Sequence, residues 1–246
     1  MARPSSAAAR AYAEAPLPDG STPWREATYT AIDFELTGLD PAVHEIISFA
    51  AVTVEGGRVH LDDTRYRVVR PRRMPNADTI RIHGLREADL AAAPPLDEVL
   101  DDLLEALTGR VLLAHVAPVE TGFLSAALSP RGLSLRNPVV DTANLAVELR
   151  RRRRQPPLSR GENADVAASS PGLSTLADSL GLPAHRPHHA QGDALTTAQV
   201  FLALATHLEE LGQATLGSLE RLSRPERRRI SPSRLLRRLG LGQGRA

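Results

Sequence analysis

The sequence predicts an α/β domain with a mixed five-stranded sheet flanked by helices. Five segments have the short, apolar or alternating composition of β-strands: residues 29–35, 45–54, 58–69, 111–114 and 139–141. The pair Gly56-Gly57 between the second and third segments is typical of a hairpin turn. The last two segments alternate with stretches of helical periodicity, which predicts parallel pairing beside the antiparallel hairpins.

Helices are expected where apolar residues recur at a spacing of three and four positions. Five segments have this pattern or lie between strand and turn signals: residues 96–107, 118–128, 142–150, 173–180 and 190–211. Gly109 and Gly181 follow two of them, in the position where glycine ends a helix. Asp141 precedes another and is expected to cap its N-terminus.

The ends of the chain differ in composition from its middle. Residues 1–26 are rich in Ala, Pro and Ser and lack periodicity, so we expect a disordered N-terminal arm. The folded domain is expected over residues 27–213, with a loop insertion at 150–171 where five arginines and two prolines interrupt the pattern. Residues 214–246 are expected to form a basic C-terminal tail.

Composition excludes several classes of protein. With 42% hydrophobic and 24% charged residues, the chain is not wholly disordered. It has no cysteine, which excludes disulfides, thiolate zinc sites and a cysteine nucleophile. No apolar run approaches the ~18 residues of a membrane span, and the N-terminus lacks a secretory signal, so we expect a cytoplasmic protein.

Charge is distributed unevenly along the chain. Residues 30–149 carry 11 Arg and 18 acids, whereas residues 150–246 carry 16 Arg and 8 acids. An acidic half followed by a basic half suits an enzyme that holds cations in one place and polyanions in another.

Acidic residues lie at three positions where a metal site can form. Asp33 and Glu35 stand two apart on one strand, so both side chains point to the same face. Neighbouring carboxylates repel each other, and a cation between them removes this repulsion. Mg²⁺ and Mn²⁺ prefer such oxygen ligands, so the pair is a candidate metal site. An isolated pair of this kind can also be the solvated end of a strand with no metal role. Glu120 opens a helix after a buried strand, and Asp193 lies in the first turns of the long helix, five residues after His188.

Four segments resemble the motifs of the DEDDh exonuclease family, which includes the proofreading epsilon subunit of bacterial DNA polymerase III and ribonuclease T. Residues 33–39, Asp-Phe-Glu-Leu-Thr-Gly-Leu, resemble the first motif, and residues 114–124, which begin Ala-His-Val-Ala, resemble the second. Residues 188–194, with histidine five positions before aspartate, resemble the third. Residues 82–85, Ile-His-Gly-Leu, resemble a histidine-glycine turn between the first two.

The second motif departs from the family pattern at three positions. Val116 replaces the usual asparagine, Val119 the aromatic residue and Glu120 the aspartate. A glutamate still binds metal, but its extra methylene moves the carboxylate by about 1 Å or more. Valine offers no aromatic face on which a base can stack.

The resemblance implies a ribonuclease H-like fold and hydrolysis of a terminal phosphodiester with two Mg²⁺ or Mn²⁺ ions. Asp33, Glu35 and Asp193 would hold the ions, with Glu120 at the second one directly or through water. His188 would be the general base, a task that suits the histidine pKa of ~6.5. The residues implied to bind the terminal nucleotide are Leu36, Thr37, Gly38 and Leu39.

The expected function is therefore 3′-to-5′ removal of nucleoside monophosphates from a single-stranded 3′ end, with DNA as the expected substrate. The same chemistry on RNA remains open, as does a nucleic-acid-binding or polymerase accessory module weakened in catalysis by the altered second motif. We expect any proofreading role to need a polymerase or repair protein in trans.

Other candidate residues have simpler interpretations. The spacing to Asp193 favours His188 over His189 as the base, and we expect a structural hydrogen-bonding role for His115. His83 is expected to lie in a loop near the first motif. For Arg150–Arg154 and the basic tail, contact with phosphates and a solvated charge run are both open.

Overall fold

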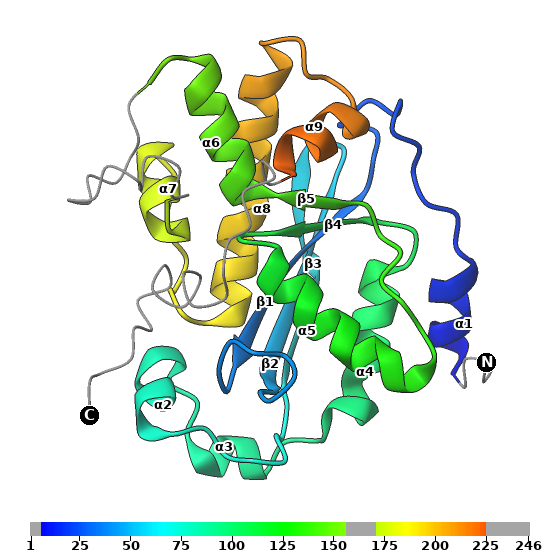
Figure 1. Ribbon diagram of the computed structural model, residues 1–246, viewed down its shortest axis with the longest axis vertical. Coiled ribbons are helices and arrows are strands. Elements are labelled where there is room, and N and C mark those ends of the chain that lie inside the picture. Colours follow the sequence, from blue (N-terminus) through cyan, green and yellow to red (C-terminus); the bar gives the residue numbers. More distant parts are fainter. Residues whose placement is uncertain (1–5, 156–170, 225–246) are drawn as a thin grey trace.

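The computed structural model describes residues 6–155 and 171–224, which form a five-stranded sheet between two groups of helices (Figure 1). The strands are β1 (Tyr29–Leu36), β2 (Ile46–Glu55), β3 (Arg58–Val68), β4 (Val111–Ala114) and β5 (Val139–Asp141). Their order is β3-β2-β1-β4-β5. Strand β2 is antiparallel to β1 and β3, whereas β4 is parallel to β1 and β5. The predicted mixed sheet is confirmed.

The central strands are apolar because helices cover both faces of the sheet. Along β1, Ala31 belongs to one hydrophobic core and its neighbour Ile32 to the other. Strand β2 is buried from Ile46 to Val54, without alternation of buried and exposed residues. Alternate residues of β1 therefore face opposite layers of helices.

The helices divide between these two faces. One core packs α6 (Thr142–Arg152), α7 (Leu173–Ser179), α8 (Ala190–Glu209) and α9 (Leu216–Ser223) against the sheet. The other packs α1 (Ala7–Glu14), α4 (Leu96–Leu107) and α5 (Pro118–Leu128), which runs on into the short helix η1 (Ser129–Arg131). In the described part of the chain no helix is long and apolar enough to cross a membrane.

Two short helices between β3 and α4 were not predicted. They are α2 (Ala77–His83) and α3 (Glu87–Ala91). Each spans at most two turns, too few for hydrophobic periodicity to appear. A local signal exists at Asn76, whose side chain accepts a hydrogen bond from the Thr79 N–H and caps α2.

The prediction of a disordered N-terminal arm is wrong for residues 6–26. Helix α1 packs against α4 and buries Tyr12, whose hydroxyl donates to Asn137 Oδ1 at 2.8 Å. Trp24 is buried and meets Phe201 of α8 edge-on, with ring centroids 5.8 Å apart. Two large aromatic side chains thus anchor a segment whose remaining composition is typical of disorder.

The predicted boundary at residue 213 is also wrong, because α9 packs against α6 and β5. Thr215 and Ser218 form a capping box at its start, a local signal that arginine-rich surroundings conceal. Helix α6 extends to Arg152, beyond the predicted start of the loop insertion. Residues 156–170 of that insertion and residues 225–246 of the tail lie outside the described residues.

Candidate active site

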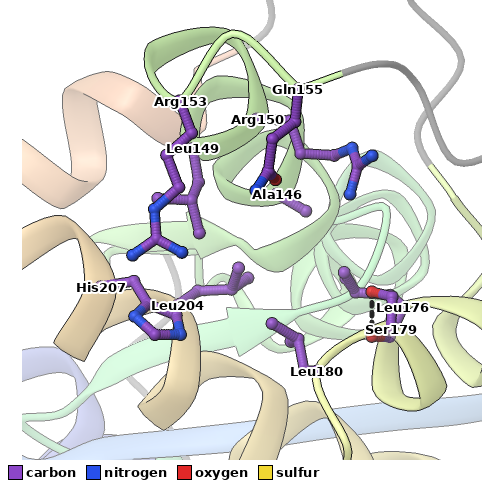
Figure 2. Close-up of a pocket in the computed structure, with 10 residues that line it drawn as sticks. All are labelled: Ala146, Leu149, Arg150, Arg153, Gln155, Leu176, Ser179, Leu180, Leu204 and His207. Carbon is purple, nitrogen blue, oxygen red and sulfur yellow. Dashed lines mark hydrogen bonds between the residues drawn. The ribbon is translucent and has the colours of Figure 1, made fainter.

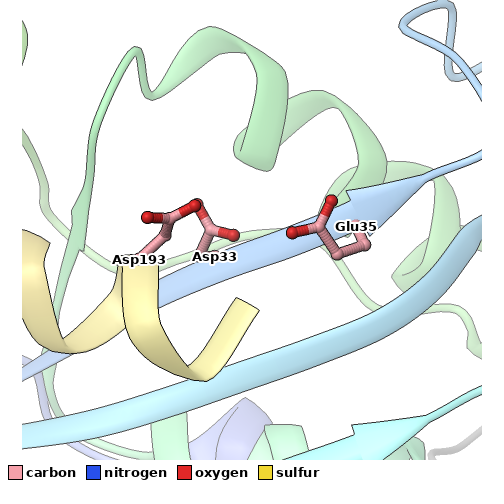
Figure 3. Close-up of side chains that lie close together, drawn as sticks. All are labelled: Asp33, Glu35 and Asp193. Carbon is pink, nitrogen blue, oxygen red and sulfur yellow. The ribbon is translucent and has the colours of Figure 1, made fainter. Parts of the chain in front are cut away.

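Three acidic side chains meet where β1 approaches the N-terminus of α8. Asp33 and Glu35 lie on the face of β1 that α8 covers, and Asp193 extends from the first turn of α8 toward them (Figure 3). One carboxylate oxygen from each residue lies within 4.8 Å of the others. The predicted strand pair and the helix acid, which is 160 positions after Asp33 in sequence, thus form one cluster.

The loop after β1 is fixed by its own hydrogen bonds. Pairing with β2 shifts register between Glu35 and Leu36, so the chain leaves the sheet directly beside the acids. The Thr37 N–H donates to the Glu45 carbonyl, and its hydroxyl accepts from the Glu45 N–H, each at 2.9 Å. The Thr37 N–H is therefore already used in a hydrogen bond within the protein.

Gly38 gives this loop its close packing. A Cβ added at this position would lie 2.5 Å from Cε1 of His44. The loop residues Leu36–Leu39, predicted to bind the terminal nucleotide, thus lie next to the acids in a conformation that requires a glycine at this position unless His44 moves.

Glu120 lies beside the cluster without belonging to the three-residue group. It occupies the first turn of α5 and is 7% exposed. Its Oε2 is buried and has no hydrogen-bond partner among the described residues. Its charge nevertheless contributes to the raised pKa of Asp33, which indicates that the two carboxylates are close.

Burial raises the pKa values of all four acids, and repulsion within the group adds to this effect at Asp33 and Glu35. Burial raises the pKa of Asp33 well above its usual range, and the charges of the other three acids raise it further. Burial raises the pKa of Glu35 and Glu120 to about 8 and that of Asp193 to about 6, the last opposed by the His188 N–H. Clustered carboxylate oxygens with an unpartnered buried Oε2 are the donor set that a hard divalent cation requires, so the residues fit such a metal.

These shifts predict that metal-free protein loses stability as pH rises. An acid whose pKa is raised in the folded state binds protons there more tightly, so stability falls between its unfolded pKa near 4 and its folded pKa near 8. Thermal unfolding in EDTA should give a larger drop from pH 5 to pH 8 for wild type than for Asp33→Asn, which removes one charge.

Two histidines change the stability of the protein with pH in the opposite direction. The pH dependence of wild type must therefore be compared with that of Asp33→Asn. Burial lowers the pKa of His83 and His189, so their contribution to stability increases with pH, and both remain in the variant. Adding Mg²⁺ at pH 8 should restore the thermal stability of the wild-type protein. Equal pH dependence in the two proteins would contradict the repulsive cluster.

The two adjacent histidines have different environments. His188 is exposed, has a φ of +60° and donates its backbone N–H to Asp193 Oδ2 at 2.9 Å. His189 is the N-cap residue of α8, and its ring stacks on Tyr66 of β3 with centroids 4.8 Å apart. His188 is therefore held beside the acids by its backbone, while the ring of His189 is held by stacking on Tyr66.

Tyr66 was not among the predicted site residues. In the sheet it pairs with Ala50, which pairs with Asp33, so all three share one face. The charge of Glu35 raises the Tyr66 pKa, after the larger effect of burial. Only the strand register, which the Gly56-Gly57 turn alone does not determine, could have revealed this neighbour.

Two further expectations are confirmed. His115 lies 3.0 Å through Nδ1 from Thr142 Oγ1 and 3.1 Å through Nε2 from the Pro171 carbonyl, which is a structural hydrogen-bonding role. Asp141 caps α6 by accepting from the Ala143 and Asn144 N–H groups. His83, expected in a loop, is instead the buried last residue of α2.

The arginine run lies away from the acids. Arg151 and Arg152 bind Glu148, and Arg153 binds Glu210. Arg150 and Arg153 line a cavity of about 200 Å³ between α6, α7 and α8 (Figure 2). His207, which also lines this cavity, follows Asp193 by 14 positions on α8, about 21 Å along the helix. The cavity is therefore separate from the acidic cluster.

The fold is that of an α/β domain, and its clustered carboxylates form a donor set that suits a divalent cation. A sequence model of the family described as "Exonuclease" matches residues 30–201. Similar sequences include a DNA polymerase III PolC-type from Thermotoga maritima and a DNA polymerase III subunit epsilon-like protein from Rhodobacter capsulatus, each 32% identical. The alignments cover 84% and 80% of this chain but only 14% and 26% of those proteins.

Solved structures agree on the fold. The nuclease domain of 3′hExo, a DEDDh family member bound to rAMP, gives a TM-score of 0.58 at 20% identity, covering 77% of this chain and 95% of that one. Exonuclease X in complex with 5′ overhanging duplex DNA gives 0.57 at 21%, covering 80% and 99%. The chain belongs to the exonuclease family. The sheet and its helices are thus of the ribonuclease H-like type, as expected.

Proposed function

We propose that this protein is a metal-dependent 3′-to-5′ exonuclease that removes nucleoside monophosphates from DNA. The observation that carries the proposal is the convergence of Asp33, Glu35 and Asp193, with ligand atoms within 4.8 Å. In a family of nucleic-acid hydrolases, such a cluster supports phosphodiester cleavage.

Asp33, Glu35 and Asp193 would hold two Mg²⁺ or Mn²⁺ ions, with Glu120 at the second. Bound divalent cations supply a reactive nucleophile from water and stabilise the charge that develops on the attacking and leaving oxygens. His188, exposed and hydrogen-bonded through its backbone to Asp193, would accept the proton of the attacking water. Residues Leu36–Leu39 would contact the terminal nucleotide from the loop beside the acids.

The role of Glu120 predicts a graded series of variants. Glu120→Gln should cut turnover severely at saturating DNA and raise the metal concentration needed, because a neutral amide replaces a charged ligand. Glu120→Asp should retain substantial activity, since it restores the usual family residue. Turnover is measured against Mg²⁺ concentration for each variant.

If Glu120 is only an acid in the first turn of a helix, Glu120→Gln should lose a few tenths of a kcal/mol of stability and little rate. Wild-type metal dependence in this variant would remove Glu120 from the site and leave three carboxylates. Thermal unfolding in EDTA verifies that each variant is folded.

DNA is proposed as the substrate because the similar sequences carry the names of DNA polymerase III proteins. RNA is the second candidate, supported by a structural neighbour titled for 3′-end recognition of histone mRNA stem-loop by a 3′-exonuclease. A polymerase or repair protein acting in trans is the proposed partner, and a cytoplasmic location stays a prediction.

End-labelled substrates test direction, sugar and catalysis together. Purified protein is incubated with single-stranded DNA, duplex DNA or RNA in Mg²⁺, Mn²⁺ or EDTA. A 5′ label should give a ladder of shortening products, and a 3′ label should give mononucleotide at once, in both cases only with metal. Immediate release of 5′-labelled mononucleotide would contradict the direction, and degradation of RNA alone would reassign the substrate. Binding without cleavage would indicate a catalytically weakened module.

A further inference from the structure

We propose that Asp141 is a positioning residue for Glu120, holding the loop between β4 and α5 through hydrogen bonds to its backbone. The inference rests on the proposed function, because it assigns Asp141 to the support of a metal ligand. Asp141 lies at the end of β5, 21 residues after Glu120 in sequence.

One carboxylate connects two helix starts. Asp141 Oδ1 accepts from the Val116 N–H at 3.2 Å, and Oδ2 accepts from the Ala117 N–H at 3.1 Å. On its own side, Oδ1 accepts from the Ala143 N–H at 2.9 Å, and Oδ2 accepts from Asn144 Nδ2 at 3.1 Å. The residue is 5% exposed, so these charge-assisted bonds form away from bulk water.

The β4–α5 loop needs this external support. Val116 has a φ of +64°, a left-handed conformation that is rare for a β-branched residue. Ala117, the N-cap residue of α5, provides no side-chain cap. Asp141 therefore supplies from the neighbouring strand the acceptor that helix α5 lacks at its own N-terminus, and it holds the strained residue in place.

Glu120 follows Ala117 by three residues, within the same helical turn, so the direction of its side chain depends on how that turn is held. Its buried Oε2 has no partner among the described residues that would orient it independently. The two carboxylates are also close enough for the Asp141 charge to raise the Glu120 pKa. A residue that binds the backbone beside a metal ligand in this way fixes the position of that ligand.

Asparagine cannot replace this carboxylate, because its NH₂ group would face an N–H donor. Asp141→Asn should therefore lose the hydrogen bond from the Ala117 N–H or from Asn144 Nδ2. The Kd for Mn²⁺ should rise by about 10-fold. Binding is measured by titration calorimetry on the full chain without nucleic acid. Exonuclease activity should need correspondingly more Mn²⁺, with kcat largely restored at saturation.

Asn137→Ala is the matched control. Asn137 is a buried polar residue near the opposite end of the same strands, where its Nδ2 donates to the Leu107 and Arg110 carbonyls at 2.7 Å each. This variant should lower the melting temperature and leave the Mn²⁺ Kd unchanged, which separates lost stability from lost positioning.

A folded Asp141→Asn protein with the wild-type Kd would overturn the positioning role. Should that variant fail to fold, Asp141→Glu carries the test, because it keeps the charge, moves the carboxylate and must also raise the Kd. Wild-type protein that binds no Mn²⁺ would instead contradict the proposed function, so the two failures are distinguishable.

Discussion

Asp193→Asn is expected to reduce exonuclease turnover by about 10³-fold or more, and Asp33→Asn should have the same effect. Each change keeps the shape of the side chain and removes one charge from the cluster of three acids. Loss of a metal ligand removes several kcal/mol of transition-state stabilisation, and each ~1.4 kcal/mol is a factor of ten in rate. Single-turnover cleavage of labelled single-stranded DNA in saturating Mg²⁺ measures the loss.

Both variants should fold, which distinguishes this loss from damage to the structure. Because the charge of Asp193 repels Asp33 and Glu35, each variant should melt at a higher temperature than wild type in EDTA at pH 8. Asp178→Asn, which changes an exposed acid on α7 outside the cluster, should retain the wild-type rate. Full Mg²⁺-dependent activity in Asp33→Asn would exclude the cluster as the metal site.

Local patterns were sufficient to predict the sheet because its strands are either apolar or alternate in polarity, and turn or helix signals separate them. They failed where stability comes from distant contacts. Residues 6–26 look disordered by composition, yet Tyr12 reaches Asn137 and Trp24 reaches Phe201. Such contacts depend on the completed fold, so no window of sequence contains them.

The acidic site, like the sheet, was predictable in part from local sequence patterns. The spacing of Asp33 and Glu35 on one strand requires a shared face. Asp193 was assigned to the same site because residues 188–194 resemble the third motif of the family. The pairing of Tyr66 with His189 and the contacts of Asp141 with the β4–α5 loop were not predictable. They depend on strand register and on the parallel pairing of β4 with β5, which join residues far apart in sequence.

His188→Ala is expected to lower turnover by about 10²–10⁴-fold, the usual contribution of a general base. His188 is exposed beside the cluster, and its backbone N–H is bound to Asp193. His188→Asn should show the same loss, because asparagine accepts the left-handed φ of this position but cannot take the proton. Rates are measured at saturating DNA and Mg²⁺, with added imidazole as a test of rescue in the alanine variant.

His189→Ala is the matched control and should lose far less activity. Its ring is stacked on Tyr66, so the change should cost about 1 kcal/mol of stability, and Tyr66→Leu should produce a similar loss. Rescue by imidazole should be confined to His188→Ala, because only there does the missing ring leave an exposed position beside Asp193. If His189→Ala is instead the slower enzyme, then His189 is the base, and the Tyr66 ring is the contact that orients it toward the acids.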